Sequence, residues 1–389
     1  MSRILVREGI RLLAGYDEGA GLTEHRARFG ELPDLDRDHL LALARAAALR
    51  GRGGAGFPFA TKLEAVAGKR RVVLVVNLAE GEPASSKDAV LGLGRPHLVL
   101  DGAVLVARAL RVREIHLAIG TEAPLVAEAV ARAISERPER MRFVIHEADD
   151  RFVAGQARAV LELMSGRPNL PVTAWAPEVF DGHRGRPTLL SNAETWAQLA
   201  VRALPGSAGL PETTLLTWDG ERQPVVIEAR EGAAWREVLP PGDEPLVVGG
   251  YHGSWVERTT LEALPLLREE MAAAGVPLGA GAAIPLAHGE CPVTMTARII
   301  DYLAAQSAGR CGPCRNGLPA LARALAGLRD GADEVERLRE LAGMVVGRGA
   351  CAHPDGTVRL VRSLLEVFPD EVDAHRAGRC ARISDRAGV

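Results

Sequence analysis

The feature that most limits the fold of this chain is an alternation of short apolar segments and longer helical segments between residues 72 and 164. The expected strands are Val72–Val76, Glu114–Ile119 and Met141–His146, and the expected helices are Pro96–Leu110, Ala123–Glu136 and Val153–Met164. Strands that alternate with helices of this length form a mainly parallel sheet with helices on both faces. The sequence therefore predicts an α/β fold.

A polar motif, Asn77-Leu-Ala-Glu80-Gly-Glu82-Pro83, directly follows the first expected strand. Ligands of open parallel sheets gather beyond the carboxyl ends of the strands. The motif is therefore placed where a ligand would bind. A surface turn with solvated carboxylates fits the same residues equally well, and both interpretations stay open at this point.

A glycine-rich loop precedes this region. Residues Arg50–Pro58 hold four glycines and two arginines, and a helix over Phe59–Ala67 is expected to follow. Glycine leaves backbone N–H groups accessible to a ligand, and arginine donors fit a phosphate. The loop therefore predicts an anion site at a helix N-terminus, with a flexible hinge as the alternative. No Gly-Lys-Ser/Thr ends it and no clear strand leads into Gly51, so it is neither a Walker A motif nor a standard dinucleotide fingerprint.

Composition narrows the function classes. The chain has 389 residues, 47% of them hydrophobic, and a net charge of −3, which favours two or three domains and gives no nucleic-acid signature. Met1–Ile10 has no signal-peptide pattern, and no uncharged apolar run reaches the roughly 18 residues of a membrane span. We therefore expect a cytoplasmic protein without direct membrane insertion.

The texture of the sequence changes twice after the α/β region. The stretch Gly166–Arg186 is rich in proline and glycine, and it precedes a helix over Asn192–Leu204 for which Ser191 or Asn192 would be the N-cap. Short strands follow at Thr213–Thr217, Pro224–Glu228 and Leu246–Val248, with a short helix at Trp235–Leu239. The remainder is helical, at Val293–Gln306, Arg315–Leu328, Glu334–Val346 and Thr357–Val367. Three domains are predicted: 1–205 as the α/β domain, 206–288 as a small β-grasp-like domain of the soluble-ligand-binding type, and 289–389 as a helical domain with a tail.

Three cysteines lie between expected helices of the last domain. Cys311-Gly-Pro-Cys314 is followed by Cys351, and thiols on loops of one helical bundle can converge. The C-x-x-C spacing suits an iron–sulfur cluster, zinc or a redox dithiol. A labile dithiol with ordinary cysteines elsewhere is the alternative, because three ligands fall short of four.

Taken together, these stretches resemble the NADH-binding flavoprotein subunit of respiratory complex I and its soluble hydrogenase and formate dehydrogenase relatives. The family's G-R-G-G-A-G-F-P-T-G-L-K matches Gly51–Lys62, and its N-A-D-E-x-E-P-G-x-x-K-D matches Asn77–Asp88. Its G-x-P-T-x-x-N-N-x-E-T matches Gly185–Thr195, its S-C-G-x-C-x-P-C-R-x-G matches Ser307–Gly317, and its C-A-x-x-D matches Cys351–Asp355. The order of motifs is kept throughout.

The resemblance implies FMN in the α/β domain, hydride transfer from NADH or NADPH, and single-electron transfer to a [4Fe–4S] or [3Fe–4S] cluster in the helical domain. The implied FMN-binding residues are Gly51, Arg52, Gly53, Gly54, Lys62, Asn77, Gly155, Ser191, Asn192 and Thr195. Phe57 and Glu82 match positions that meet NADH, and Cys311, Cys314 and Cys351 would bind the cluster. The implied electron acceptor is a ferredoxin-like or [2Fe–2S] protein, within a larger redox complex as a further expectation.

Departures from the family pattern concern both the cluster and the nucleotide. Ala308 replaces the first cluster cysteine, so the fourth ligand would come from Cys291, Cys380, His353 or water, or no cluster would form. The family's Y-x-C-G-E-E-T becomes Phe152–Arg158, which loses both glutamates to Gln156 and Ala157. Ala79 replaces an aspartate, and Ala65 stands where an adenine-stacking aromatic is expected.

These departures leave a second function open, an electron-relay or scaffold subunit that has lost NADH oxidation. A thiol oxidoreductase is the least favoured class, because no thioredoxin-like strand precedes Cys311. The main prediction is an FMN-dependent oxidoreductase that passes electrons from NAD(P)H through an iron–sulfur centre.

Overall fold

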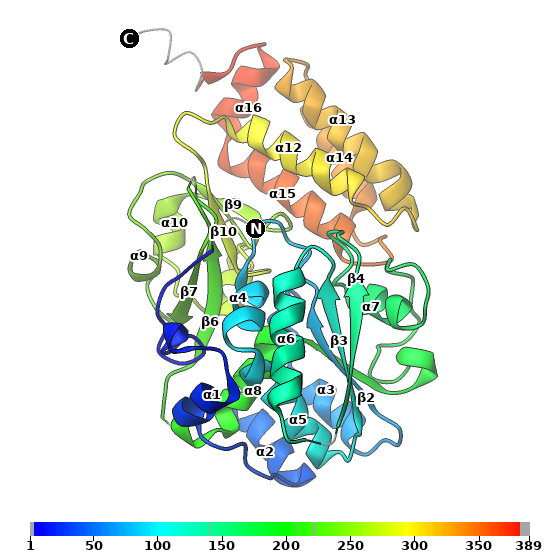
Figure 1. The fold of residues 1–389 in the computed structure, drawn as a ribbon. Coiled ribbons are helices and arrows are strands. Elements are labelled where there is room, and N and C mark those ends of the chain that lie inside the picture. The colour runs from blue at the N-terminus through cyan, green and yellow to red at the C-terminus, as the bar shows by residue number, and fades with distance from the viewer. Residues whose placement is uncertain (1–3, 140, 208, 221, 382–389) are drawn as a thin grey trace. The chain divides into compact units, whose positions relative to one another are not determined.

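The computed structural model describes residues 4–139, 141–207, 209–220 and 222–381, which form two compact units (Figure 1). The first unit contains residues 4–81, 85–217 and 223–231, and the second contains the other described residues. The three predicted domains stay a prediction, and their first three and last eight residues lie outside the described part of the chain.

A four-stranded parallel sheet with the order β4-β3-β2-β5 lies in the first unit. Its strands are β2 (Val73–Leu78), β3 (Glu114–Gly120), β4 (Arg142–Ala148) and β5 (Thr188–Asn192). Every residue of β2 is buried, as expected for a central strand that is covered on both faces. The predicted α/β fold with a parallel sheet is confirmed. The strand β5 was not expected, because residues 188–192 carry more polar side chains than the other strands.

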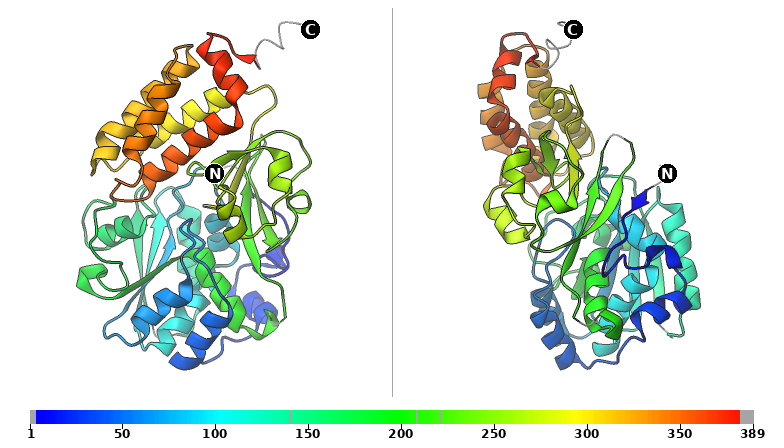
Figure 2. Two further views of the ribbon diagram at one scale, coloured as in Figure 1. Left: turned by 180° about the vertical axis from the view of Figure 1, so that it is seen from behind. Right: turned by 90° about the vertical axis from the view of Figure 1, so that its left-hand side faces the viewer.

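Helices cover both faces of this sheet (Figure 2). They are α1 (Leu22–Phe29), α2 (Arg37–Ala46), α3 (Phe59–Ala67), α4 (Lys87–Gly94), α5 (Pro96–Ala109), α6 (Pro124–Glu136), α7 (Ala157–Met164) and α8 (Ala193–Ala203), with 3-10 turns η1 (Tyr16–Glu18), η2 (His183–Gly185) and η3 (Pro205–Ser207). Leu74 and Val76 of β2 pack into a large core with α5 and α8, whereas Val73 and Val75 pack against α7. This division follows from the two-residue period of side chains along a strand.

Three further strands belong to the first unit. They are β1 (Leu5–Val6), β6 (Thr213–Trp218), whose last residue is counted with the second unit, and β7 (Val225–Arg230), in the order β1-β7-β6. The strands β1 and β7 are parallel, with Leu5 opposite Val225. The carboxylate of Glu228 on β7 accepts hydrogen bonds from the backbone N–H groups of Arg11, Leu12 and Leu13. A buried carboxylate thus ties the N-terminal segment to this strand.

The second unit combines short strands with a helical bundle. The strands β8 (Leu246–Val248), β9 (Ser254–Val256) and β10 (Ala282–Pro285) pair antiparallel in the order β10-β8-β9, next to α9 (Trp235–Val238), α10 (Arg258–Glu262) and α11 (Arg268–Ala273). The bundle consists of α12 (Pro292–Ala305), α13 (Leu318–Arg329), α14 (Val335–Val345), α15 (His353–Val367) and α16 (Pro369–Arg376), drawn from yellow to red in Figure 1. The predicted helical C-terminal region is confirmed.

Two helix limits in the bundle differ from the prediction. The helix α13 begins at Leu318 instead of Arg315, because residues Pro313–Gly317 form the π-helical turn η4 ahead of it. The helix α15 begins at His353, four residues before the expected Thr357, because the proline that follows His353 suits a helical first turn. The short helix α16 was not expected.

No single helix in the described residues is long and apolar enough to cross a membrane, although α4 and α5, which bend by 89° at their junction, meet the criteria of length and composition as a pair.

Candidate functional site

The glycine loop and two of the polar motifs meet at the carboxyl edge of the parallel sheet. In the β2–β5 pairing Asn77 lies opposite Asn192, and Val76 lies opposite Ser191. A Cβ atom at Gly53 would lie 3.3 Å from Cβ of Asn192, so the loop packs directly over this strand end. Asn77 lies inside β2 and not after it, which corrects the expected strand limit. The structure therefore brings Gly53, Asn77, Ser191 and Asn192 to one edge of the sheet.

The loop itself is closed at its base and open at its tip. The N–H of Gly51 donates to the carbonyl of Phe57 (2.9 Å), and the N–H of Phe59 donates to the carbonyl of Leu49 (2.8 Å). Gly54 and Gly56 have φ angles of 96° and 62°, a conformation that favours glycine. Residues 53–55 are exposed, and α3 starts directly after the loop at its predicted residue. The geometry is that of an accessible loop at a helix N-terminus.

Arg52 points into the protein and anchors the loop. Its residue is 2% exposed, and Nη2 donates to Oε1 of Glu231 (2.6 Å) and to the carbonyl of Thr213 (3.3 Å). Its backbone N–H donates to Oγ1 of the buried Thr195 (3.0 Å). The expectation that the guanidinium offers phosphate donors is corrected by this burial, since its contacts are internal. Thr195 and Arg52 hold the loop in place from below.

Asn77 joins two loops at the end of the sheet. Its side-chain amide donates to the carbonyl of Gly155 (2.7 Å), and its Oδ1 accepts the N–H of Ala79 (3.1 Å). A Cβ atom at Gly155 would lie 2.2 Å from the carbonyl oxygen of Ala79. Only glycine permits this approach of one backbone to the other. The retained Gly155 therefore has a packing reason in this structure.

Lys62 has a partner that the sequence analysis did not identify. Its Nζ donates to Oε1 of Glu178 (2.7 Å) and to the carbonyl of Leu190 (3.3 Å). Burial alone would raise the pKa of Glu178, but the charge and hydrogen bond of Lys62 hold that pKa below its ordinary value. The ion pair fixes the Lys62 ammonium at the first turns of α3, beside β5. Glu178 lies in the proline- and glycine-rich stretch, where no local pattern marked it.

A buried charged group lies beneath Asn192. Nζ of Lys87 contacts Oδ1 of Asp88 (2.7 Å), Oε2 of Glu194 (3.3 Å) and Oδ1 of Asn192 (3.1 Å). The amide of Asn192 also donates to Oδ2 of Asp88 (2.5 Å). These bonds fix the orientation of the Asn192 side chain. The sequence contained a signal for this group, since Lys87-Asp88 and Glu194 belong to the matched motifs, but it did not show that they meet.

Glu80 lies at the edge of that group. Its carboxylate accepts hydrogen bonds from Oγ of Ser85 (2.5 Å) and from the N–H of Ala89 (3.2 Å). Burial, together with the nearby charge of Asp88, raises the pKa of Glu80 to about 7. A carboxyl group with such a pKa changes its charge near neutral pH.

The two residues expected to meet NADH have different surroundings. Phe57 is 48% exposed in the first unit. Glu82 belongs to the second unit, where its Oε2 accepts the N–H of Tyr251 (2.9 Å). A Cβ atom at Gly250 would lie 2.5 Å from the carboxyl carbon of Glu82, and Gly250 has a φ angle of 80°. The carboxylate of Glu82 is thus seated on a glycine turn.

The three cysteines expected to bind a cluster lie together in the second unit. Cys314 is 3% exposed in the turn η4, and burial raises its pKa to about 12, with the neighbouring thiols of Cys311 and Cys351 adding to the shift. The backbone N–H of Gly309 donates to the Cys314 sulfur, so the segment that holds Ala308 lies against this group. A methyl group there cannot replace a thiolate ligand.

The structure narrows the alternatives for a fourth ligand. Both ring nitrogens of the buried His353 are hydrogen bonded, to Nε2 of His252 (3.0 Å) and to the carbonyl of Leu303 (2.8 Å). Cys291 precedes α12, whereas Cys311 follows it, and this helix of 14 residues is about 21 Å long at 1.5 Å per residue. Cys380 lies with Cys291. Among the sources named from the sequence, water is the one that this geometry leaves for the cluster.

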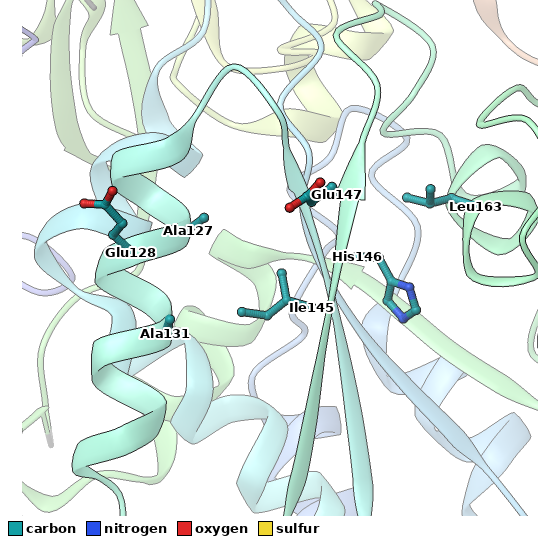
Figure 3. A pocket seen from close by; sticks show the side chains of 7 residues that line it. All are labelled: Ala127, Glu128, Ala131, Ile145, His146, Glu147 and Leu163. Atoms are coloured by element: carbon teal, nitrogen blue, oxygen red, sulfur yellow. The ribbon is translucent and has the colours of Figure 1, made fainter.

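A shallow hollow of about 640 Å³ is found elsewhere in the first unit, between α6, β4 and α7 (Figure 3). It is lined by Ala127, Glu128, Ala131, Ile145, His146, Glu147 and Leu163. None of these seven residues was predicted to belong to the site, and the hollow contributes nothing to its chemistry.

Comparisons with known proteins agree with this arrangement. Residues 44–201 match the model of the Nuo51 FMN-binding domain, and residues 294–375 match that of the NADH-ubiquinone oxidoreductase-F iron–sulfur binding region. The first range contains the glycine loop and the strand ends, and the second contains Cys311, Cys314 and Cys351. The chain therefore has an FMN-binding domain and an iron–sulfur binding region of this family.

Curated relatives cover most of the chain. The second F-type chain of the NADH-quinone oxidoreductase of Rhizobium meliloti is 28% identical over 94% of this chain and 94% of its own length. The F-type chain of the NADH-quinone oxidoreductase of Mycobacterium tuberculosis is 29% identical over 88% and 85%. The HndC component of the NADP-reducing hydrogenase of Solidesulfovibrio fructosivorans is 25% identical over 86% and 75%.

A solved structure extends the comparison to the fold. The NAD+-reducing [NiFe]-hydrogenase in the air-oxidized state matches with a TM-score of 0.83 and 27% identity, over 95% of this chain and 67% of that chain. The two family models, the ordered motifs and this shared fold together show that the chain belongs to the family of NADH-binding flavoprotein subunits of respiratory complex I and related hydrogenases.

Proposed function

We propose that this protein is an FMN-dependent oxidoreductase that takes hydride from NADH or NADPH and passes single electrons through an iron–sulfur centre to a ferredoxin-like or [2Fe–2S] protein. The observation that carries this proposal is the meeting of the exposed glycine loop with Asn77 and Asn192 at the carboxyl edge of the sheet. That edge is where parallel sheets bind nucleotides.

The residues present fit an FMN molecule. Gly53 and Gly54 leave the loop tip free of side chains, and two positive φ angles turn its backbone outward from the base. A phosphate can then approach backbone N–H groups at the start of α3. Bound FMN supplies the chemistry that joins a two-electron donor to a one-electron acceptor. Gly155 and the asparagines of β2 and β5 form the other wall of the site.

The chain's own side chains orient this site. Thr195 holds the backbone of the loop through the N–H of Arg52, Glu178 holds the Lys62 ammonium, and Lys87 holds the amide of Asn192. Each bond is internal, so the loop and strand ends are positioned before any ligand arrives. Such preorganisation lowers the entropy lost on binding.

The donor set in the second unit fits an iron–sulfur cluster. Three thiols converge from η4 and from the loop before α15, and thiolates are the usual ligands of such clusters. We infer a cluster with three cysteine ligands, in which water completes the coordination or a [3Fe–4S] form is kept.

We further place the chain within a larger redox complex in the cytoplasm. The relatives are named as subunits of NADH-quinone oxidoreductase and of an NADP-reducing hydrogenase, which supports such an assembly. All five cysteines are free thiols, as is usual in a reducing compartment.

Anaerobic purification followed by absorption spectroscopy tests this function. We expect a yellow-brown protein whose flavin absorbance is bleached by NADH or NADPH within seconds. A correctly folded, colourless protein that does not take up added FMN would exclude the proposal.

An electron-relay or scaffold subunit is the second candidate. It is favoured by Ala79, Gln156 and Ala157, which replace acidic residues of the family pattern, and by the Glu82 carboxylate, which is bound to the N–H of Tyr251. Flavin that is reduced by dithionite but by neither NADH nor NADPH would support this candidate over the first.

A further inference from the structure

Four metal-binding side chains meet in the helical bundle, apart from the three-cysteine group. They are Cys291 at the N-cap of α12, Glu371 and His375 on α16, and Cys380 after that helix. One donor atom from each lies within 4.8 Å of the other three, and the first three residues are buried. Side chains from the two ends of the bundle sequence therefore converge on one point.

The separations of the donor atoms fit a tetrahedron. Sγ of Cys291 lies 3.2 Å from Nε2 of His375 and 3.5 Å from Oε1 of Glu371. The same Oε1 lies 3.1 Å from Sγ of Cys380 and 3.4 Å from Nε2 of His375. Ligands at about 2.0–2.3 Å from a tetrahedral zinc ion are spaced by about 3.3–3.8 Å. Small movements of these side chains would make room for the ion.

The histidine of this group has the tautomer that a metal requires. Nδ1 of His375 lies 3.0 Å from the backbone carbonyl of Arg329, which can only accept a hydrogen bond. The proton is therefore on Nδ1, and the lone pair on Nε2 faces the two cysteines and the glutamate. A carbonyl that fixes the ring of a metal-binding histidine in this way is a common outer contact of zinc sites.

This group is distinct from the iron–sulfur region. The matched iron–sulfur model covers residues 294–375, which leaves out both Cys291 and Cys380. The helix α12, about 21 Å long, separates Cys291 from the segment that leads to Cys311. The two sets of thiols therefore serve different centres.

We propose that Cys291, Glu371, His375 and Cys380 bind one Zn²⁺ ion in a closed, structural site. Two sulfurs, one imidazole nitrogen and one carboxylate oxygen suit this borderline-soft ion, and four protein ligands leave no position for a substrate. The ion joins the start of α12 to α16 and to the residue after it. Because α16 also packs on α13 and α15, the site clamps the two ends of the bundle.

Metal analysis of the full-length protein tests the proposal. We expect about one zinc per chain after purification without a histidine tag under reducing conditions, and less than about one fifth of that in Cys291→Ser and Cys380→Ser. Cys311→Ser is the matched control, since it removes a thiol from the other centre: it should lose iron and keep zinc. Cys380 lies outside the helices, so its variant should fold even if Cys291→Ser does not.

Cobalt gives an independent readout. Replacement of zinc by Co²⁺ should produce the intense visible bands of a tetrahedral cobalt–thiolate site in the wild type and not in Cys380→Ser. Absence of zinc after incubation with zinc chloride, unchanged zinc in Cys380→Ser, or a disulfide between Cys291 and Cys380 in freshly prepared reduced protein would each overturn the proposal.

Discussion

At the scale of single residues, Gly53 carries the most specific function. It packs against Cβ of Asn192 at a distance that leaves little space for a side chain. We expect Gly53→Val to lower FMN occupancy more than tenfold, because its branched side chain would fill the approach to the loop amides. Gly68→Val is the control, since Gly68 is exposed and no atom lies within 4 Å of its added Cβ. Flavin content per folded chain is the measurement, and full occupancy in Gly53→Val would refute the role of the loop.

Glu80 gives a prediction about pH. Its pKa is raised from an ordinary 4.5 to about 7, so its contribution to the free energy of unfolding is complete below pH 4.5 and is lost as the pH rises through 7. Glu80→Gln removes this titration and mimics the protonated form. The stability of the variant relative to wild type should therefore increase between pH 4.5 and 7, by up to about 1.4 kcal/mol per pH unit. Denaturant unfolding at several pH values measures it, and a difference that is constant with pH would contradict the prediction.

Ala308 offers a gain of function. The segment beside it donates an N–H to the sulfur of Cys314, so a thiol at position 308 would lie close to the cysteine group. We expect Ala308→Cys to raise the iron content and to slow the loss of the brown absorbance in air, because a fourth thiolate replaces an exchangeable ligand. Ser307→Cys, one residue earlier, is the control. Equal iron content and air sensitivity in Ala308→Cys and wild type would show that the position does not reach the cluster.

At the scale of elements, the contact between α5 and α8 depends on a small residue. A Cβ atom at Gly102 would lie 2.0 Å from the carbonyl oxygen of Trp196, so the two helices touch through their backbones. We expect Gly102→Ala to destabilise the first unit by about 1–3 kcal/mol.

The control for this prediction is Gly343→Ala in α14, where the added methyl group meets no atom within 4 Å. Alanine favours a helix there and should stabilise by about 0.5–1 kcal/mol. Hydrogen exchange of α5 and α8 separates the two variants. Unchanged protection of these helices in Gly102→Ala would disprove the close backbone contact.

The elements also show what local patterns can predict. The run of apolar residues in β2 and the alanine- and leucine-rich texture of α5 identified them correctly, because complete burial leaves a continuous apolar signal. The strand β5 escaped prediction because it ends in Ser191 and Asn192, polar residues that favour a helix cap. Asn192 does cap α8, but it is also the last residue of the strand.

At the scale of the whole molecule, the two centres lie in different units. We therefore expect Cys311→Ser to lose the iron–sulfur absorbance while it keeps FMN and its bleaching by NADH or NADPH. Electron transfer to a ferredoxin should fall at least tenfold, whereas direct reduction of ferricyanide by the flavin should continue. Anaerobic spectra and the two acceptor assays measure this. Loss of FMN together with the cluster would contradict the independence of the units.

The sequence by itself determined the parallel α/β sheet, the glycine loop, the helical C-terminal region and the family. These features depend on neighbouring residues, because burial, backbone conformation and ligand spacing leave periodic or short signals. Only the tertiary structure decided which partner each polar group takes. It turned Arg52 inward to Glu231, paired Lys62 with Glu178 and gathered Cys291, Glu371, His375 and Cys380. Such pairings join residues far apart in the chain, so no local pattern contains them.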